Sequence, residues 1–259
     1  MKRTGHKLSA LLITYNEIDH IADVLDNLDF ADEIIVVDSL STDGTDRAVE
    51  AHGKARLIRR PFVNFTDQKA FALEQAAYDW VVFTDADERI PEDLRQEILE
   101  VVSDEGEKAS AYYMRRTFMF KDKPLHFSGW QSDKNFRLFR KSKCRFDPGR
   151  IVHETLQVDG PVDTLKNRLI HYSYNDYNEY KGKMIRYGQM RAREARAEGK
   201  TFNWALMILR PAYKFLNHYL LRLGILDGRK GIVISYLNAL GVYARYKELH
   251  RLERENRKT

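Results

Sequence analysis

The first hundred residues alternate between short apolar runs and longer stretches with helical periodicity. Four runs have the length and composition of buried strands: Lys7–Ile13, Glu33–Val37, Arg56–Ile58 and Trp80–Thr84. Each is followed by a helical pattern, at Ile18–Leu28, Asp43–His52, Thr66–Ala76 and Pro91–Val102. Apolar strands separated by helices indicate a mostly parallel sheet covered on both faces. The alternation therefore predicts a doubly wound, Rossmann-like α/β half, which binds ligands beyond the carboxyl ends of its strands.

Beyond this half the pattern changes twice. Residues 109–175 combine strand-like runs with Gly and Pro turn signals, which is typical of an antiparallel extension. Helical periodicity then dominates residues 176–259. We therefore predict three parts: a ligand-binding α/β half at 1–108, an extension of the same domain at 109–175 and a helical region at 176–259.

Charge divides along the same line. Residues 176–259 hold 18 Lys and Arg against 8 Asp and Glu, whereas residues 1–175 hold 25 against 30. Between Leu206 and Leu223 an apolar stripe at helical spacing runs beside a basic stripe of Arg210, Lys214, His218 and Arg222. Pro211 predicts that this helix begins there. An anionic membrane surface is one partner for such a helix, and packing of the apolar stripe against the rest of the protein is the other.

Cysteine content and hydropathy suggest the compartment. Cys144 is alone, so no disulfide forms within the chain, which fits a reducing environment. We see neither a convincing secretory signal nor an apolar run long enough to span a bilayer. The expected location is the cytoplasm, with attachment to the inner membrane face left open.

Polar clusters follow all four predicted strands, at Thr14-Tyr15-Asn16-Glu17, at Asp38–Thr45, from Arg59-Arg60 to Lys69, and at Asp85-Ala86-Asp87-Glu88. In a parallel sheet these clusters share one rim. Convergent carboxylates repel each other unless a cation lies between them, and Mg²⁺ or Mn²⁺ binds such oxygens together with substrate phosphates. The rim therefore predicts a divalent metal at Asp85 and Asp87. No nucleic-acid-binding module accompanies the basic tail, so we expect no nucleic-acid partner.

Two side chains allow two interpretations each. Asp38 either accepts a hydrogen bond from a pyrimidine N–H or caps the turn into the next helix. His171 either completes the metal shell or is a structural histidine, which is the commoner outcome. Lys69, Arg137 and Arg140 are candidates for holding a diphosphate or an anionic acceptor.

The ordered motifs Thr-Tyr-Asn-Glu, Val-Val-Asp-Ser-Leu-Ser-Thr-Asp-Gly-Thr and Phe-Thr-Asp-Ala-Asp-Glu resemble family 2 of the glycosyltransferases, which have the GT-A fold. The resemblance implies an inverting transfer from a nucleotide-diphosphate sugar. It places the nucleotide near Thr14, Tyr15, Glu17 and Asp38, with Asp85 at the ribose or metal and Asp87 at the metal. The second motif departs from the frequent Asp-Asp-Gly-Ser, because Ser39 and Leu40 follow Asp38.

An inverting transfer needs a general base for the acceptor hydroxyl. Glu154, in Val-His-Glu-Thr, is our candidate, with Asp133 and Asp147 in reserve. The His-Glu pair and Leu226-Asp227-Gly228 resemble lipopolysaccharide inner-core β-1,4-glucosyltransferases, which implies UDP-glucose as donor and a lipopolysaccharide-core or other lipid-linked glycan as acceptor.

Alternative functions remain. Capsule, exopolysaccharide or protein glycosylation would use the same donor chemistry, and a membrane-associated protein could retain a nucleotide-sugar site without catalysis. A nucleotidyltransferase would need a Gly-rich phosphate loop after the first strand, and residues 8–28 contain no glycine.

Overall fold

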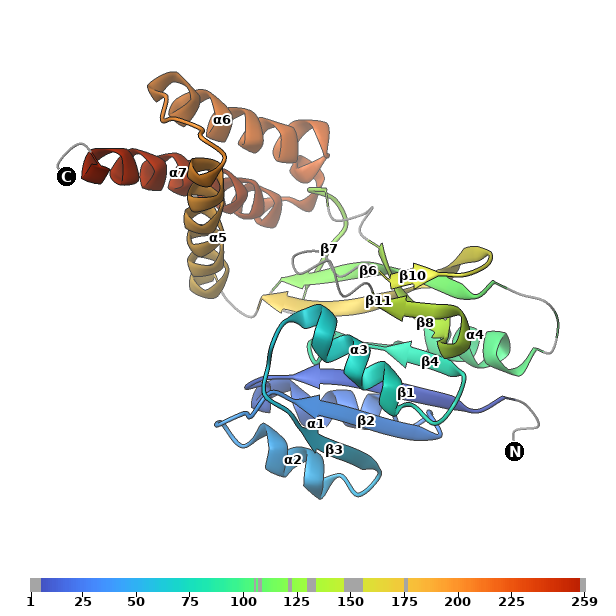
Figure 1. Cartoon of the computed structure of the whole chain (residues 1–259). Helices are drawn as coiled ribbons and strands as arrows, with labels where there is room; N and C mark the ends of the chain where they lie inside the picture. Colours follow the sequence, from blue (N-terminus) through green and yellow to red (C-terminus); the bar gives the residue numbers. More distant parts are fainter. Residues whose placement is uncertain are drawn as a thin grey trace. The chain divides into compact units, whose positions relative to one another are not determined.

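A computed structural model of the chain describes residues 6–104, 106, 109–120, 123–129, 134–146, 156–174 and 177–256. The chain forms two compact units, drawn together in Figure 1. The first unit consists of Met1–Arg116 and Lys134–His171, and the second of Thr117–Asp133 and Tyr172–Thr259. The three-part division predicted from the sequence stays a prediction.

The first unit begins with the predicted parallel half. Four strands lie parallel in the order β3-β2-β1-β4: β1 (Leu8–Thr14), β2 (Glu33–Asp38), β3 (Ala55–Arg59) and β4 (Trp80–Phe83). The helices between and after them are α1 (Ile18–Asn27), α2 (Thr45–Ala51), α3 (Phe65–Gln75) and α4 (Glu92–Ser103). The strand order reverses beside β1, so the carboxyl ends of β1 and β4 border the crevice in which such sheets bind ligands.

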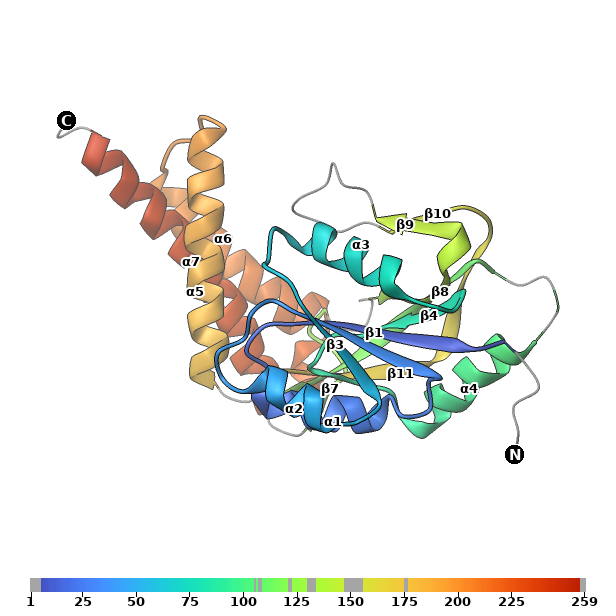
Figure 2. The same ribbon diagram turned by 60° about the horizontal axis from the view of Figure 1, so that its bottom comes forward.

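Alternate residues of the strands face two separate cores. Leu8, Ala10 and Leu12 of β1 pack with α1 and α4, while Leu11 packs with α3 on the other face. Figure 2 shows α3 on one side of the sheet and α1, α2 and α4 on the other. The near-continuous apolar strands are thus explained by burial on both faces.

The helix starts differ slightly from those predicted. Gly44, at φ 99°, occupies the N-cap position of α2, so the helix begins two residues after Asp43. The Asp43 carboxylate nevertheless accepts a hydrogen bond from the Thr45 N–H at 3.0 Å. Pro91 is extended and α4 begins at Glu92.

The predicted antiparallel extension continues the same sheet. Strand β8 (Lys134–Arg140) pairs antiparallel with β4, followed by β6 (Ala111–Phe120), β11 (Val162–Tyr174) and the two-residue β5 (Glu88–Arg89). Strand β7 (Lys123–Leu125) pairs with β6. A separate hairpin joins β9 (Cys144–Phe146) to β10 (Leu156–Val158), and a 3₁₀ turn, η1 (Lys141–Lys143), precedes it.

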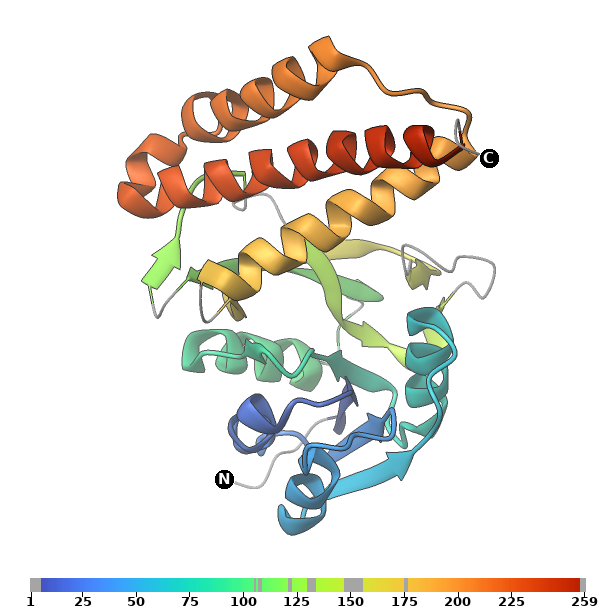
Figure 3. The same cartoon turned by 90° about the vertical axis from the view of Figure 1, so that its left-hand side faces the viewer.

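The second unit contains the long helices α5 (Tyr177–Ala197), α6 (Trp204–Leu216) and α7 (Arg229–Asn256). Figure 3 shows α7 between the other two. A Cβ on Gly188 would lie 2.3 Å from the Gly241 carbonyl oxygen, so glycine allows α5 and α7 to approach closely. Phe118, Tyr180 and Ile234 form part of this unit's own core.

Helix α6 begins seven residues before Pro211, so the predicted start at that proline is wrong. The Asn203 side chain caps the first turn by accepting a hydrogen bond from the Leu206 N–H, and Pro211 lies inside the helix. A π-helical turn, η2 (Asn217–Leu221), and a 3₁₀ turn, η3 (Gly224–Asp227), lead to α7. Asp227 holds the β7 loop through the N–H groups of His126 and Phe127.

Candidate active site

A cavity of about 690 Å³ lies at the carboxyl ends of β1 and β4 in the first unit. It brings together six residues that the sequence placed on one rim, and His171, which the sequence offered as a metal-shell or structural histidine; the six are Thr14, Tyr15, Glu17, Lys69, Asp85 and Asp87. Ile13, Ser39, Phe62, Phe65, Ala86 and Arg116 complete the lining. Its size lies within the range of about 300–1,000 Å³ that is usual for small-molecule sites.

Asp38 is fully buried beside this cavity. Its carboxylate accepts hydrogen bonds from the Thr14 hydroxyl at 3.0 Å, from the Ser41 hydroxyl at 2.5 Å and from the Ser41 N–H at 2.8 Å. These contacts fit the turn-capping interpretation. A role of Asp38 toward a nucleobase stays a prediction.

Leu40 adopts a left-handed backbone conformation, with φ 63°. It stands where the frequent Asp-Asp-Gly-Ser motif has glycine. A side chain in this region of φ costs about 1–2 kcal/mol. The two hydrogen bonds that the Asp38 carboxylate accepts from Ser41 therefore hold the loop in a conformation that Leu40 itself disfavours.

The acidic triplet is fixed by its neighbours. The Arg89 guanidinium donates to the carbonyl oxygens of Ala86 at 2.7 Å and His20 at 3.0 Å. The Glu88 carboxylate accepts from the Asp85 N–H at 3.1 Å. The loop after β4 is thus tied to α1 and closed on itself, which gives Asp85 and Asp87 defined positions.

Arg137 of β8 neutralises the buried acids. Its guanidinium donates to Glu88 at 2.6 Å and also to Asp85, and the Arg116 guanidinium lies 3.3 Å from the same Glu88 oxygen. Burial raises the pKa of Glu88, and the opposing charge of Arg137 does not fully offset this. Burial also tends to raise the pKa of Asp85, but the charges of Arg137 and Lys69 outweigh it and hold that pKa well below its usual range. Asp85 is therefore an anion whose counter-charge is built into the sheet.

Asp87 and His171 meet because β5 pairs with β11. The register sets His171 opposite Glu88, and the His171 Nε2 atom lies 3.0 Å from the Asp87 Oδ2 atom. The two residues are 84 positions apart in the chain. The antiparallel extension thus brings an imidazole to the acidic rim of the parallel half.

The donor atoms at this point suit a hard divalent cation. An Asp87 oxygen and a His171 nitrogen face one another in the cavity, whereas Asp85 is bound by Arg137. Within the described part of the chain, no group of three or more His, Cys, Asp and Glu side chains is arranged to hold a metal. Two protein ligands are nevertheless sufficient for Mg²⁺ or Mn²⁺ when substrate phosphates and water supply the rest.

A second cavity, of about 400 Å³, adjoins the first through shared wall residues Lys69, Asp85 and Arg116. Its lining includes Tyr113 and Phe136, whose rings stack with centroids 3.7 Å apart. The arrangement offers an aromatic surface beside a cluster of cations.

Sequence reasoning did not find the paired role of Arg137. The only signal in the sequence was a charged residue inside an apolar strand. In the structure the Arg137 side chain is 5% exposed and is bound by Asp85 and Glu88, so it is not available to bind a diphosphate. Arg140 lies over the Trp80 ring at 4.8 Å. The candidate base Glu154, with Asp133 and Asp147, lies outside the described residues.

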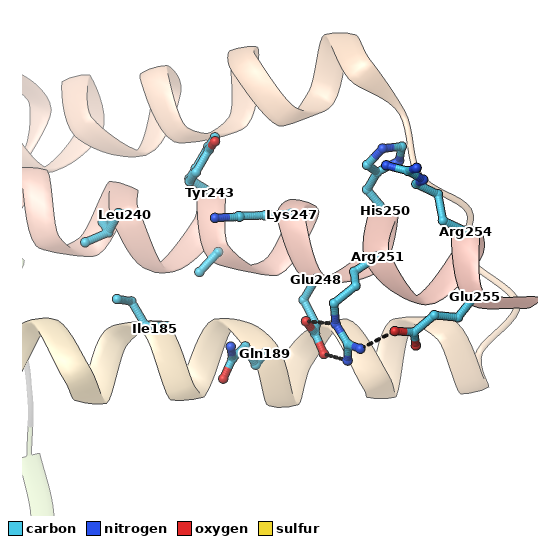
Figure 4. A pocket seen from close by; sticks show the side chains of 11 residues that line it. Ile185, Gln189, Leu240, Tyr243, Lys247, Glu248, His250, Arg251, Arg254 and Glu255 are labelled. Carbon is cyan, nitrogen blue, oxygen red and sulfur yellow. Dashed lines mark hydrogen bonds and ion pairs between the residues drawn. The ribbon is translucent and has the colours of Figure 1, made fainter.

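Another cavity, of about 620 Å³, lies within the second unit between α5 and α7. Figure 4 shows Arg251 bound to both carboxylates of its lining, Glu248 and Glu255. Because Arg251 already neutralises both carboxylates, we do not consider this cavity a reaction centre. None of the described helices is long and apolar enough to cross a bilayer.

Comparison with known proteins agrees with this architecture. The profile of glycosyl transferase family 2 matches residues 9–156. The chain is 30% identical over 253 residues to the lipopolysaccharide core biosynthesis glycosyltransferase LpsC of Rhizobium meliloti, covering 92% of this chain and 93% of that protein. It is 27% identical over 261 residues to an uncharacterized glycosyltransferase of Rickettsia typhi, covering 97% and 89%.

Among solved structures, the mannosyltransferase PcManGT of Pyrobaculum calidifontis, in complex with GDP-mannose and Mn²⁺, superposes with a TM-score of 0.55. It is 17% identical and the match covers 95% of this chain and 87% of that one. The shared architecture is the GT-A fold, and the protein is a glycosyltransferase. The chain belongs to glycosyl transferase family 2, and it is related to a lipopolysaccharide-core enzyme.

Proposed function

We propose that this glycosyltransferase transfers glucose from UDP-glucose, with inversion, to a lipopolysaccharide-core or other lipid-linked glycan at a membrane face. The observation that carries the donor site is the cavity that joins the β1 loop, Lys69 and the acidic triplet to His171, while the choice of UDP-glucose and of the acceptor is supported by the resemblance to lipopolysaccharide-core glycosyltransferases. The nucleotide would lie against Thr14, Tyr15 and Glu17, and the diphosphate would extend toward Lys69 and Asp87.

Asp87 and His171 would hold the Mg²⁺ or Mn²⁺ ion together with the donor diphosphate. When bound, the ion supplies positive charge for the diphosphate that leaves. Lys69 supports the same charge from α3. Arg137 keeps Asp85 ionised and in place, because its guanidinium binds that carboxylate directly.

The acceptor would enter the second cavity, where the stacked Tyr113 and Phe136 rings offer an apolar surface to the C–H face of a sugar. The acceptor hydroxyl oxygen forms the new bond to the anomeric carbon while the bond from that carbon to the diphosphate oxygen breaks. The hydroxyl proton passes to a carboxylate base, for which Glu154 is proposed. The products are the inverted glycoside and the nucleoside diphosphate.

Thermal shift with a panel of nucleotide sugars tests the donor. UDP-glucose should raise Tm in Mn²⁺ but much less in EDTA, and Asp87→Asn should lose the metal-dependent part. Asp163→Asn, at an exposed position on β11, is the matched control and should keep it. Equal stabilisation of the Asp87→Asn variant would refute the metal site, and a larger effect of another sugar nucleotide would reassign the donor.

Transfer to truncated lipopolysaccharide tests the acceptor half. Tyr113→Ala should raise the acceptor KM by up to about tenfold, corresponding to an aromatic contact of up to about 1.4 kcal/mol, with unchanged donor binding. Glu154→Gln should abolish transfer and leave the UDP-glucose shift intact. Activity only on protein or capsular acceptors would favour those alternatives, and donor binding without transfer to any acceptor would favour a non-catalytic protein.

A further inference from the structure

Helix α6 and the turns after it expose an unusual number of large apolar side chains. We define the α6–η3 surface as those that are 46–73% exposed: Trp204, Ile208, Leu209, Tyr213, Leu216, Leu220, Leu221, Leu223, Ile225 and Leu226. Scattered apolar residues are normal on a protein surface, but a contiguous set of this kind marks an interaction site.

The direction of α6 explains this exposure. Of the predicted apolar stripe, Leu209, Tyr213, Leu216, Leu220 and Leu223 are exposed. The basic stripe divides, because Lys214 is half-buried and His218 is buried, while Arg210 and Arg222 remain exposed.

Contacts within the second unit hold α6 in this orientation. The His218 Nδ1 atom lies 2.8 Å from the Ser128 carbonyl oxygen. Helix α7 packs along α6. The helix therefore leaves a second apolar side in solvent although α7 packs against it, whereas an ordinary surface helix exposes a polar side.

Within residues 199–226 the charged side chains have one sign, while Glu198 pairs with Lys200 and Glu253 of α7 accepts a hydrogen bond from the Phe202 N–H near the start of α6. Residues 199–226 contain Lys200, Arg210, Lys214 and Arg222 but neither Asp nor Glu. The next acid, Asp227, is occupied by the His126 and Phe127 N–H groups. An apolar surface that carries the exposed cations Arg210 and Arg222 complements a layer that is anionic outside and apolar beneath.

The side-chain types fit the same occupant. Trp204 and Tyr213 each combine an apolar ring with a hydrogen-bonding group, which suits the boundary between headgroups and acyl chains. A second copy of the chain would bring two cationic surfaces together, and their repulsion disfavours that pairing.

We propose that the α6–η3 surface inserts into the headgroup and acyl boundary of an anionic lipid leaflet, with Arg210 and Arg222 at the lipid phosphates. The inference deepens the membrane-face part of the proposed function, but it does not depend on which sugar is transferred. It assigns attachment to a defined surface of the second unit.

Vesicle flotation with the full chain tests the proposal. Wild type should float with vesicles of phosphatidylcholine and phosphatidylglycerol, and much less with phosphatidylcholine alone. Arg210→Glu with Arg222→Glu should lower binding at least about tenfold, since each basic residue near an anionic surface contributes about a factor of five. Leu209→Ser with Leu216→Ser should lower it similarly. Failure of wild type to float, or flotation of both double variants to the same extent as wild type, would overturn the proposal.

A matched control carries the same change of charge elsewhere. Lys247→Glu with Arg254→Glu alters exposed positions of α7 at the groove in Figure 4 and should float like wild type. Equal loss in this control would mean that net charge, not this surface, governs binding. Unchanged urea midpoints show that the variants are folded. Dimers that the Leu209→Ser, Leu216→Ser variant abolishes, without lipid binding by wild type, would assign the surface to a second copy.

The donor assay separates this proposal from the proposed reaction. The α6 variants should keep the Mn²⁺-dependent rise in Tm with UDP-glucose. The Asp87→Asn variant should lose that rise in Tm but float with the vesicles like wild type. Flotation without any donor binding would refute the reaction and leave the lipid surface standing.

Discussion

In the first unit, Arg137 and Glu88 are charged groups that the sheet removes from water and binds to one another. In the second unit, α6 does the opposite, because Leu209, Tyr213 and their neighbours are apolar groups left in water. Each arrangement is unfavourable by itself, because buried charges lose their hydration and exposed apolar side chains remain in contact with water. In the first unit the ion pair between Arg137 and Glu88 offsets the lost hydration within the fold. In the second unit only an external partner can cover the exposed apolar side chains. Arrangements of this kind concentrate where a protein acts.

Removal of the counter-charge should have the largest effect. Arg137→Met should lower the free energy of unfolding by about 3–5 kcal/mol, because it leaves the buried Glu88 carboxylate without its main cation. Urea denaturation measures this, with Arg145→Met at the exposed edge as control. Adding Glu88→Gln to Arg137→Met should recover part of the loss. A loss below about 1 kcal/mol in the single variant would show that the pair is solvated.

Two leucine truncations should sharpen the contrast within the second unit. Leu237→Ala removes a fully buried side chain from its core and should cost about 2–5 kcal/mol. Leu209→Ala removes one that is 62% exposed and should change the free energy of unfolding by no more than about 0.5 kcal/mol. Comparable losses in urea denaturation would mean that the α6 face is already covered in solution.

His218 should make the second unit sensitive to mild acid. Burial, together with the charges of Lys214 and Arg222, lowers the pKa of His218 to about 4. The neutral imidazole is favoured in the fold, so its stabilisation is complete above the unfolded pKa near 6.5 and declines as pH falls toward 4. We expect wild type to lose on the order of 1 kcal/mol relative to His218→Asn between pH 7 and pH 5. Parallel stability curves for the two proteins would contradict this.

Leu40→Gly should have the smallest effect and the opposite sign. Glycine relieves the left-handed strain of Leu40, while the more flexible unfolded chain offsets part of the gain. The net stabilisation should be about 0.5 kcal/mol, seen as a small rise in Tm. Leu40→Ala keeps a Cβ at the same φ and should show no such rise.

Local pattern was sufficient to predict the parallel half. Strands such as Glu33–Asp38 are apolar throughout because both faces are covered, and the three ordered motifs identified the rim and the family. The predicted antiparallel extension and helical region are confirmed in outline.

Contacts between distant segments were not predictable in the same way. The spacing of Leu209 and Tyr213 indicated an apolar stripe, but the packing of α7 decides which side of α6 faces water. Arg137 was a candidate for holding a diphosphate or an anionic acceptor, and its ion pairs were not predictable because its partners on the β4 loop lie 49–52 residues earlier. Local rules also placed the start of α6 at Pro211, whereas the Asn203 cap and packing sustain the helix through it.

The two-residue strand β5 has a consequence for how the site forms during folding. Asp87 reaches its position as soon as the parallel half is complete, but His171 arrives only when β11 has paired with β5. Closing a segment of 84 residues is a slow, non-local event compared with pairing of β1 to β2. During synthesis the chain therefore has a sheet and an acidic loop before Asp87 and His171, the proposed metal ligands, are together. Metal affinity should therefore appear late in refolding, and its time course should report the pairing of β11 with β5.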